Sequence, residues 1–354
     1  MALRDVIGQE RAVNILLKTL QRGRIPSAYL FAGESGIGKK FTAINLAKAL
    51  NCLRHRNALR IIHNEIKNGD KSHITDHTSR IDACDECSSC RKIDTNIHPD
   101  IKLISPENGQ IRIEEIRTIE ENLSLKAFEG RWKIVIVEEA DTMNPFAANA
   151  FLKTLEEPPE GSLIILISSI PDRLPETIRS RCSRINFTPL SYEACKKVIK
   201  AAIVKQSMSN FQKEKDFESR LSIIAKLSMG RPGLAVSTDL LEEREWFLKL
   251  LREMIKAEKD GWSSKDEMEK WFEYLLIFLR DLSITKIIKD KKNLINIDIE
   301  DYIKNFSSGI DLKVIIENYH KLSILRGYFN FNLNKSLTWN YTGSLLRVLK
   351  PLIL

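Results

Sequence analysis

The sequence predicts an α/β fold: a parallel sheet with helices on both faces, then a helical lid and an all-α C-terminal domain. Three observations lead to this prediction. Strand-like and helix-like segments alternate through the first 190 residues, which is the pattern of layered α/β domains. A glycine-rich loop at residues 33–38 separates one strand from a helix. From about residue 191 strand signals almost vanish, and helical periodicity takes over.

The individual elements follow from short apolar runs and from helical spacing. Ala28–Ala32, Lys133–Val137 and residues 163–168 are apolar runs of strand length, as expected for the buried strands of a parallel sheet. Residues 41–50 place apolar side chains at helical spacing directly after the glycine loop. Residues 149–155 predict a further helix, which the two prolines that follow terminate.

The rest of the chain divides into a polar insertion and a helical region. Residues 54–82 are rich in His, Asn, Lys and Asp, which is typical of a surface insertion with some disorder. Residues 192–206 and 217–229 are predicted helices, and longer amphipathic segments begin at residue 242. Aromatic residues recur in these segments at helical spacing, which indicates core packing rather than nucleic-acid binding. They are Trp246, Phe247, Trp271 and Phe272.

The composition is that of a soluble globular protein with two or three domains. The chain has 354 residues, of which 43% are hydrophobic and 29% charged. No apolar run approaches the roughly 18 residues that span a bilayer, and the N-terminus lacks the apolar stretch of a signal peptide. We therefore expect a cytoplasmic protein with no membrane partner. The net charge of +8 fits a nucleic-acid partner without requiring one.

The glycine-rich loop matches the phosphate-binding pattern G-x-x-x-x-G-K. Gly33, Gly36 and Gly38 let backbone N–H groups turn toward phosphates, and the helix that follows adds a favourable dipole. Lys39 is placed to reach the β- and γ-phosphates of a nucleotide. The strand before the loop and the helix after it make this a specific signal rather than a chance glycine turn.

The residues expected to hold magnesium depart from the pattern. Lys40 stands where a magnesium-binding loop has Ser or Thr, so one metal ligand is lost and a second ammonium is introduced. The strand at 133–137 ends in Glu138 and Glu139, where such ATPases have an Asp for the metal and then a Glu for the attacking water. Both substitutions affect the same function, which indicates a site released from hydrolysis.

Three closely spaced cysteines predict a structural metal site. Cys84, Cys87 and Cys90 lie on one short segment, and Cys52 can supply a fourth thiolate. Four thiolates in a tetrahedron suit Zn²⁺, whereas an iron–sulfur pattern needs a further Cys-Pro that the chain lacks here. Unliganded or redox-active cysteines are the alternative. Other candidates for the fourth ligand are His55, His63, His73 and His77.

Taken together, these motifs resemble the clamp-loader AAA+ family of bacterial DNA replication. Residues 6–9 (VIGQ) look like the family's N-terminal signature, and the cysteine segment followed by residues 98–100 (HPD) is a feature of its bacterial members. Residues 148–159 (ANAFLKTLEEPP) and residues 178–182 (IRSRC) are specific to the family. The motifs cover about the first 235 residues, and the remainder is similar only in length and helical character.

The resemblance implies roles for several residues and a division into domains. Lys39 matches the phosphate lysine, Glu138 and Glu139 the acidic pair, and Ser169 lies near the sensor of the γ-phosphate. Arg181 matches the arginine finger, which in this family points into a neighbour's ATP site; its alternative is an ordinary surface arginine. The implied domains are an AAA+ domain at 1–189 with a zinc module at 52–90, a lid at 190–241 and a helical collar at 242–354.

Two further residues set the lid apart from that of the family's motors. Motor subunits carry an arginine a few residues after Gly230, at the position that Gly233 takes here. Arg231 is two residues early and adjoins Pro232, so its role is left open. The sequence also leaves open whether ATP binds without being hydrolysed, because the glycines and Lys39 suffice for phosphate contact.

Three functions are compatible with these motifs. The favoured one is a non-hydrolysing assembly subunit of a five-membered ring with gamma or tau motor subunits and a delta subunit, which loads a sliding clamp onto primer-template DNA. Three features support this function: the altered magnesium ligands, the glycine at position 233, and a chain that ends after one collar-sized domain. An ATP-hydrolysing motor of the gamma or tau type is the second, supported by Lys39 and Glu139. A small-molecule P-loop kinase is the third, and it leaves residues 148–159 and 178–182 unexplained.

Overall fold

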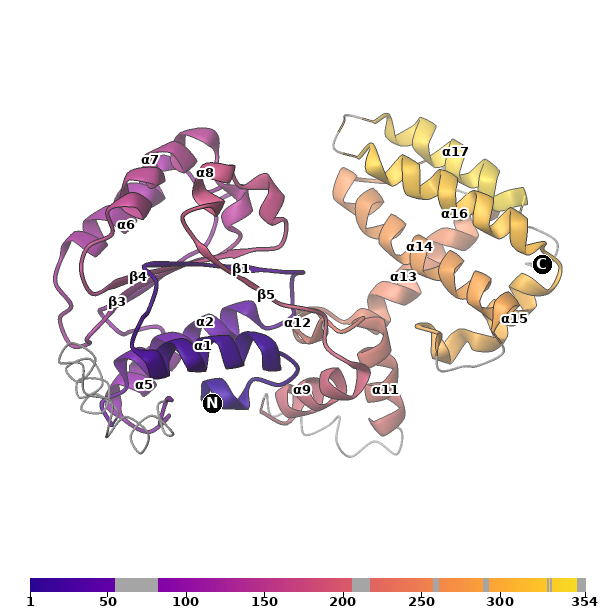
Figure 1. Ribbon diagram of the computed structural model, residues 1–354. Coiled ribbons are helices and arrows are strands. Elements are labelled where there is room, and N and C mark those ends of the chain that lie inside the picture. The colour runs from indigo at the N-terminus through magenta and orange to yellow at the C-terminus, as the bar shows by residue number, and fades with distance from the viewer. Residues whose placement is uncertain are drawn as a thin grey trace. The chain divides into compact units, whose positions relative to one another are not determined.

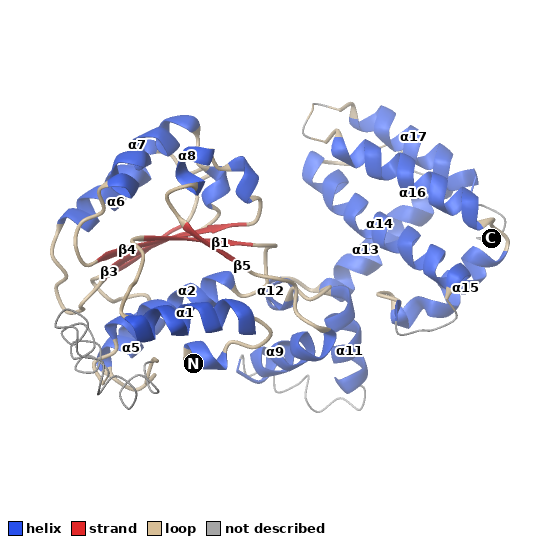
Figure 2. Ribbon diagram, viewed as in Figure 1, coloured by secondary structure: helices blue, strands red, loops and turns tan. Residues whose placement is uncertain are grey.

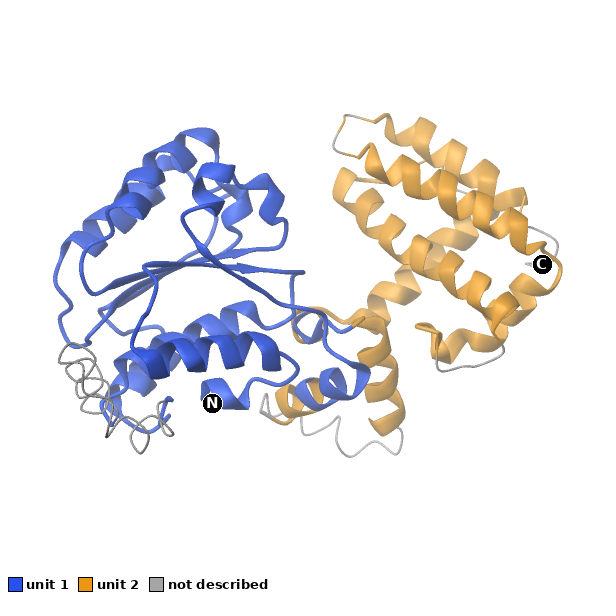
Figure 3. Cartoon of the chain, viewed as in Figure 1, with its two compact units in different colours: residues 1–198, 230–233 blue, residues 199–229, 234–354 orange. Residues whose placement is uncertain are grey.

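The computed structural model describes residues 1–54, 82–205, 217–256, 261–288, 293–329, 331 and 333–348. The chain forms two compact units (Figure 3). Unit 1 comprises residues 1–198 and 230–233, and unit 2 comprises residues 199–229 and 234–354. Residues 190–241, predicted as a separate lid, are thus divided between the two units, and the lid stays a prediction. Most of the expected insertion and its four candidate histidine ligands lie outside the described residues.

Unit 1 is built on a five-stranded sheet in which every pairing is parallel (Figure 2). The strand order is β2-β3-β4-β1-β5. Because all strands run the same way, their carboxyl ends meet at one edge, where ligands of open α/β sheets bind. The parallel pairing of all five strands confirms the predicted parallel sheet. The strands are β1 (Ala28–Ala32), β2 (Ile101–Ile104), β3 (Lys133–Val137), β4 (Ser162–Ser168) and β5 (Ser183–Asn186).

Helices cover both faces of this sheet (Figure 1). On one face lie α1 (Glu10–Arg22), α2 (Lys39–Asn51) and α5 (Ser88–Asp94). On the other lie α6 (Ile113–Ser124), α7 (Pro145–Glu156) and α8 (Glu176–Arg179). α2 begins directly after the glycine loop, and α7 contains the helix predicted at 149–155. The predicted two-faced layer arrangement is confirmed.

The three central strands were predicted from the sequence, and the two edge strands were not. Every residue of β1, β3 and β4 is buried, since helices cover both sides of them and select continuous apolar runs. The edge strands β2 and β5 are largely exposed or half-buried and read IKLI and SRIN. These two strands were not predicted, because a short edge strand with charged side chains has no apolar signature.

Unit 2 is helical, which confirms the predicted all-helical C-terminal region. Phe247, Trp271 and Phe272 are buried in its main apolar cluster, while Trp246 is only partly buried. Asp281, fully buried, accepts hydrogen bonds from the backbone N–H groups of Ile295 and Asn296. None of the described helices of the chain is long and apolar enough to cross a membrane. Two helices, α9 (Tyr192–Lys205) and α12 (Pro232–Ser237), begin in unit 1 and end in unit 2. The others are α11 (Phe217–Leu227), α13 (Leu240–Lys256), α14 (Lys265–Ile287), α15 (Glu300–Ser308), α16 (Leu312–Gly327) and α17 (Lys335–Val348).

The His98-Pro-Asp100 motif fixes a turn at the amino end of the sheet. The Asp100 carboxylate is fully buried and accepts backbone N–H bonds from Phe128, Glu129 and Gly130 at 2.7, 2.8 and 2.7 Å. Its own N–H donates to His98 Nδ1 at 3.1 Å. Burial alone would raise the pKa of Asp100, but the three N–H donors outweigh it and lower the pKa.

We expect Asp100→Asn to destabilise the chain by about 1–3 kcal/mol at pH 7, because it removes a charge-assisted acceptor of three N–H groups. The folded pKa is lowered, so the stabilisation by the carboxylate is complete above the unfolded pKa of about 3.9 and is lost as pH falls through the folded pKa. Urea unfolding at pH 7 and in acid should show the difference from wild type shrinking with acidity. Asp172→Asn, at an exposed carboxylate, is the control; an equal loss for both variants would contradict the assignment.

Candidate functional site

The phosphate loop lies at the carboxyl edge of the sheet, between β1 and α2. Gly33 has φ +148° and a β-carbon there would lie 2.5 Å from the Phe187 carbonyl oxygen, so only glycine fits. Gly38 has φ +95° and serves as the N-cap of α2 without any side-chain cap. The first N–H groups of α2 are therefore not claimed by a capping side chain, as in anion-binding helix N-termini.

Lys39 is folded over this loop. Its side chain is buried, and its ammonium donates to the carbonyl oxygens of Gly33 and Glu34, the latter at 2.5 Å. Burial lowers the pKa of Lys39 to about 8, although the nearby charges of Asp141 and Glu34 raise it. A phosphate would restore the stability of the charged form, since it supplies a negative partner in a desolvated place.

Lys40 and Glu138, the two substituted magnesium positions, bind each other. The Lys40 ammonium lies 2.8 Å from Glu138 Oε1. The other carboxylate oxygen, Oε2, accepts a hydrogen bond from Ser105 Oγ at 2.7 Å. Three elements meet here: the start of α2 and the segments that follow β2 and β3. Ser105 has no motif around it, and only the parallel sheet places it beside Glu138.

Glu139 and Ser169 lie at the same edge of the sheet. Glu139 is exposed and has φ +46°, ψ +44°, a left-handed conformation that is uncommon for a residue with a side chain. The backbone N–H of Ser169 donates to Asp141 Oδ1 at 3.1 Å. The roles of Glu139 in polarising water and of Ser169 in sensing phosphate stay predictions, and Asp141 is the residue that links their segments.

Residues 230–233 lie directly against the phosphate loop. The N–H of Gly233 donates to the Gly36 carbonyl at 2.8 Å, and a β-carbon at Gly233 would lie 2.8 Å from Gly36 Cα. An arginine at residue 233 therefore does not fit this arrangement. The side chain of Arg231 instead reaches Glu34 of the loop, with 3.8 Å between Nε and Oε2.

The VIGQ signature also holds the phosphate loop, through Gln9. Gln9 Nε2 donates to the carbonyl oxygens of Ile37 and Thr188 at 3.1 and 2.7 Å. Its Oε1 accepts the N–H of Thr188 at 3.3 Å. The buried side-chain amide of Gln9 thus joins the phosphate loop to the segment after β5, and this link explains the structural role of the VIGQ motif.

Arg181 is held at the carboxyl end of α7 and α8. Its guanidinium donates to the Thr177 carbonyl at 2.8 Å and forms an ion pair with Glu156. Both partners belong to this helical corner rather than to the phosphate loop, and the Arg181 side chain remains 35% exposed. From the sequence, residues 155–159 (LEEPP) were interpreted only as part of a family motif, and Glu156 was not predicted as a partner of Arg181.

The four predicted cysteine ligands are brought together. The sulfur atoms of Cys52, Cys84, Cys87 and Cys90 all lie within 4.8 Å of one another. Two N–H···S contacts, Cys87 to Cys84 Sγ at 3.4 Å and Cys90 to Cys87 Sγ at 3.5 Å, shape the loop. This cluster, which we call the cysteine centre, could hold one metal ion.

The acid–base properties of the cysteine centre fit a metal. Hydrogen bonding with Cys90 lowers the pKa of Cys52 to about 4, and the same contact raises the pKa of Cys90. Once one of the two thiols has lost its proton, the other is therefore harder to ionise, because closely spaced thiolates repel one another. A divalent cation relieves this repulsion and binds all four sulfurs as thiolates.

Charged residues tie the cysteine centre to its surroundings. Lys48 of α2 is almost fully buried and donates to Asp85 at 2.5 Å and to Asp94 at 2.9 Å. The Asp82 carboxylate accepts the N–H groups of Leu3 and Arg4 at 2.8 and 3.0 Å. The cysteine centre is thus joined both to the helix after the phosphate loop and to the first residues of the chain.

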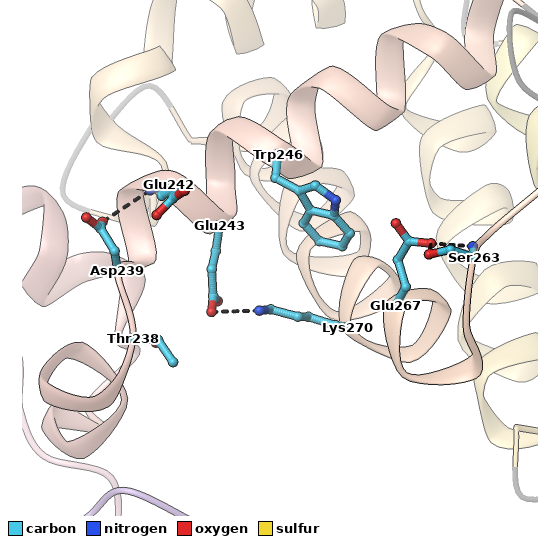
Figure 4. A pocket seen from close by; sticks show the side chains of 8 residues that line it. All are labelled: Thr238, Asp239, Glu242, Glu243, Trp246, Ser263, Glu267 and Lys270. Carbon is cyan, nitrogen blue, oxygen red and sulfur yellow. Dashed lines mark hydrogen bonds and ion pairs between the residues drawn. The ribbon is translucent and has the colours of Figure 1, made fainter.

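A separate pocket in unit 2 lies between α13 and α14 (Figure 4). Its lining is acidic, with Asp239, Glu242, Glu243 and Glu267, and Lys270 already pairs with Glu243 at 2.6 Å. The surplus of carboxylates repels phosphate groups. This pocket therefore does not fit a nucleotide.

The parallel sheet and its glycine loop define a protein with a P-loop fold of the nucleotide-binding type. The chain belongs to the family described as DNA polymerase III, delta subunit, whose model matches residues 8–68 and 64–191. This confirms the resemblance inferred from the motifs. The chain is 31% identical over 201 residues to DNA polymerase III subunit delta' of Bacillus subtilis, a match that covers 57% of this chain and 53% of that protein.

Other relatives include subunits with different names. DNA polymerase III subunit gamma of Buchnera aphidicola is 33% identical over 205 residues, covering 58% of this chain and 50% of that protein. The matches thus span about half the length of these relatives. A gamma subunit-related protein of Thermotoga maritima of known structure matches 89% of this chain and 99% of its own, but its 19% identity and TM-score of 0.36 are too low to bear on function.

We expect the purified chain to contain about one metal ion, and Cys87→Ser to lose it, because each thiolate contributes to a shared site. Elemental analysis of protein freed of loosely bound metal measures this directly. Cys182→Ser is the matched control, since Cys182 lies outside the cysteine centre. A folded wild-type chain without metal, or equal metal loss in both variants, would rule the metal site out.

Proposed function

We propose that this chain is a delta-prime subunit of a DNA polymerase III clamp loader that assembles the complex without hydrolysing ATP. The observation that carries the proposal is the Lys40–Glu138 ion pair. It occupies both positions from which a P-loop ATPase holds magnesium. The family match and the similarity to a delta' subunit support the assignment to a clamp loader.

In the proposed complex the chain serves its neighbour's nucleotide rather than its own. Arg181 is partly exposed on a helical corner, where its guanidinium can exchange Glu156 for the phosphates of an adjacent subunit. The partners are gamma or tau motor subunits and a delta subunit in a ring of five. Sliding clamp and primer-template DNA are reached through this ring in the cytoplasm.

The remaining parts have structural roles in this proposal. The cysteine centre holds zinc, because four thiolates in a closed cluster match structural zinc sites. Residues 1–189 form the nucleotide-binding-type domain, 190–241 the lid and 242–354 the collar that joins the ring. A motor subunit of the gamma or tau type is the second candidate, supported by the similarity to a gamma subunit and by Lys39 and Glu139.

The purified chain is expected to show no magnesium-dependent ATP turnover above that of a Lys39→Met variant, since neither Lys40 nor Glu138 offers a free metal ligand. Phosphate release with and without magnesium measures this. Of these three proteins, only Lys40→Thr, which restores the hydroxyl, is expected to show a rise in turnover. Robust hydrolysis by the unmodified chain would instead identify a motor subunit.

Arg181→Ala is expected to lower the DNA-stimulated ATPase rate of the partner subunits at least about tenfold, because an arginine finger stabilises transition-state charge. The rate is measured after mixing with purified motor and delta subunits. Arg184→Ala is the matched control, because Arg184 is a nearby exposed arginine whose Nε donates to Asn186 Oδ1 at 2.8 Å. An unchanged rate with normal assembly would exclude the arginine-finger role.

A further inference from the structure

The phosphate loop does not fit a magnesium ion. Mg²⁺ requires near-octahedral oxygen ligands and usually takes a carboxylate and substrate phosphates. In P-loop ATPases the residue after the lysine and the acidic residue after the strand provide protein ligands. Here the first is an ammonium, and the second has one oxygen bound to that ammonium and the other to Ser105.

The same residues provide a positive charge without a metal. The Lys40 side chain is 49% exposed, so its ammonium is accessible while it contacts the less exposed Glu138 carboxylate. Pairing with Lys40 neutralises the charge that would otherwise repel phosphate oxygens from the end of β3. The loop also retains Lys39, the glycine turns and the uncapped N-terminus of α2.

We propose that this loop binds the phosphate chain of a nucleoside triphosphate without a divalent cation, and that Lys40 takes the place of magnesium. Lys39 turns from the Gly33 and Glu34 carbonyls to the phosphates, and Lys40 bridges Glu138 and a phosphate oxygen. The metal-free anion is preferred over its magnesium complex, since bound Mg²⁺ has to displace the Lys40–Glu138 pair. The bound nucleotide acts as a structural ligand of the loop.

This inference rests on the nucleotide-binding-type domain of the proposed function but not on Arg181. A nucleotide bound in this way stabilises the loop that hydrogen bonds from Gly233 and Gln9 already hold. It is not hydrolysed, because no group activates the leaving phosphate through a metal. If the chain did not bind ATP without metal, the proposed role of Arg181 would still stand. If Arg181→Ala did not lower the partners' ATPase rate, the result of the ATP titration would still stand.

The test is calorimetric titration of the whole chain with ATP, once in magnesium and once in EDTA. We expect wild type to bind ATP in EDTA at least as tightly as in magnesium. Lys40→Thr should bind at least about tenfold more weakly in EDTA, since one charge-assisted contact is lost and each tenfold corresponds to about 1.4 kcal/mol. In magnesium the same variant should bind more tightly than in EDTA, because the hydroxyl admits the metal.

Two variants control for folding and for general charge. Lys39→Met should abolish binding in both conditions while keeping the unfolding temperature, which locates ATP at the loop. Lys18→Thr removes an exposed lysine on α1 and should leave both affinities unchanged. Binding of ATP by wild type only in magnesium, no binding in either condition, or equal losses for Lys40→Thr and Lys18→Thr would each overturn the proposal.

Discussion

The parallel direction of the five strands is the constraint on which the candidate site depends. It brings the carboxyl ends of β1, β2, β3 and β4 to one edge, so that residues distant in sequence meet there. The phosphate loop, Ser105, Glu138 and the segment before Ser169 all take their places from this rule. Gln9 and Gly233 then fasten the loop from outside the sheet. In an alternating antiparallel sheet with the same strand order, β2 and β4 would run opposite to β1 and β3. Ser105 and Ser169 would then lie at the opposite edge from the phosphate loop and Glu138.

In the proposed mode of binding, the site differs from that of an ATPase in its cation, since the Lys40 ammonium that pairs with Glu138 takes the place of a divalent metal. A divalent metal polarises phosphate and organises water, whereas an ammonium on a side chain only neutralises charge and donates hydrogen bonds. The fold is therefore compatible with nucleotide recognition while the residues needed for turnover are altered. Relatives named delta' and gamma both match this part of the chain.

The sequence predicted the sheet, the phosphate loop and the four cysteines because each has a local signature: apolar runs, glycine spacing and cysteine spacing. It did not predict β2 and β5, since edge strands need no continuous apolar run. Nor did it identify Ser105, Glu156 or the Gly233–Gly36 contact. These partners are defined by tertiary packing between segments that lie tens of residues apart, and a single sequence contains no signal for such a pairing. The contact between Arg231 and Glu34 could not be predicted from the sequence for the same reason, because it depends on where residues 230–233 pack.

The contact between Arg181 and Glu156 also affects the entropy of association. A free arginine side chain has about 2 kcal/mol of rotamer entropy to lose when it is immobilised. In this chain Thr177 and Glu156 already restrict the guanidinium during folding. A neighbouring subunit that captures it therefore meets a side chain with little freedom left to lose, but it must compete with the Glu156 carboxylate. In the proposed ring, the phosphates of a bound nucleotide would compete with Glu156 for Arg181 and an empty neighbouring site would not, so the contact would discriminate between nucleotide-bound and empty neighbours.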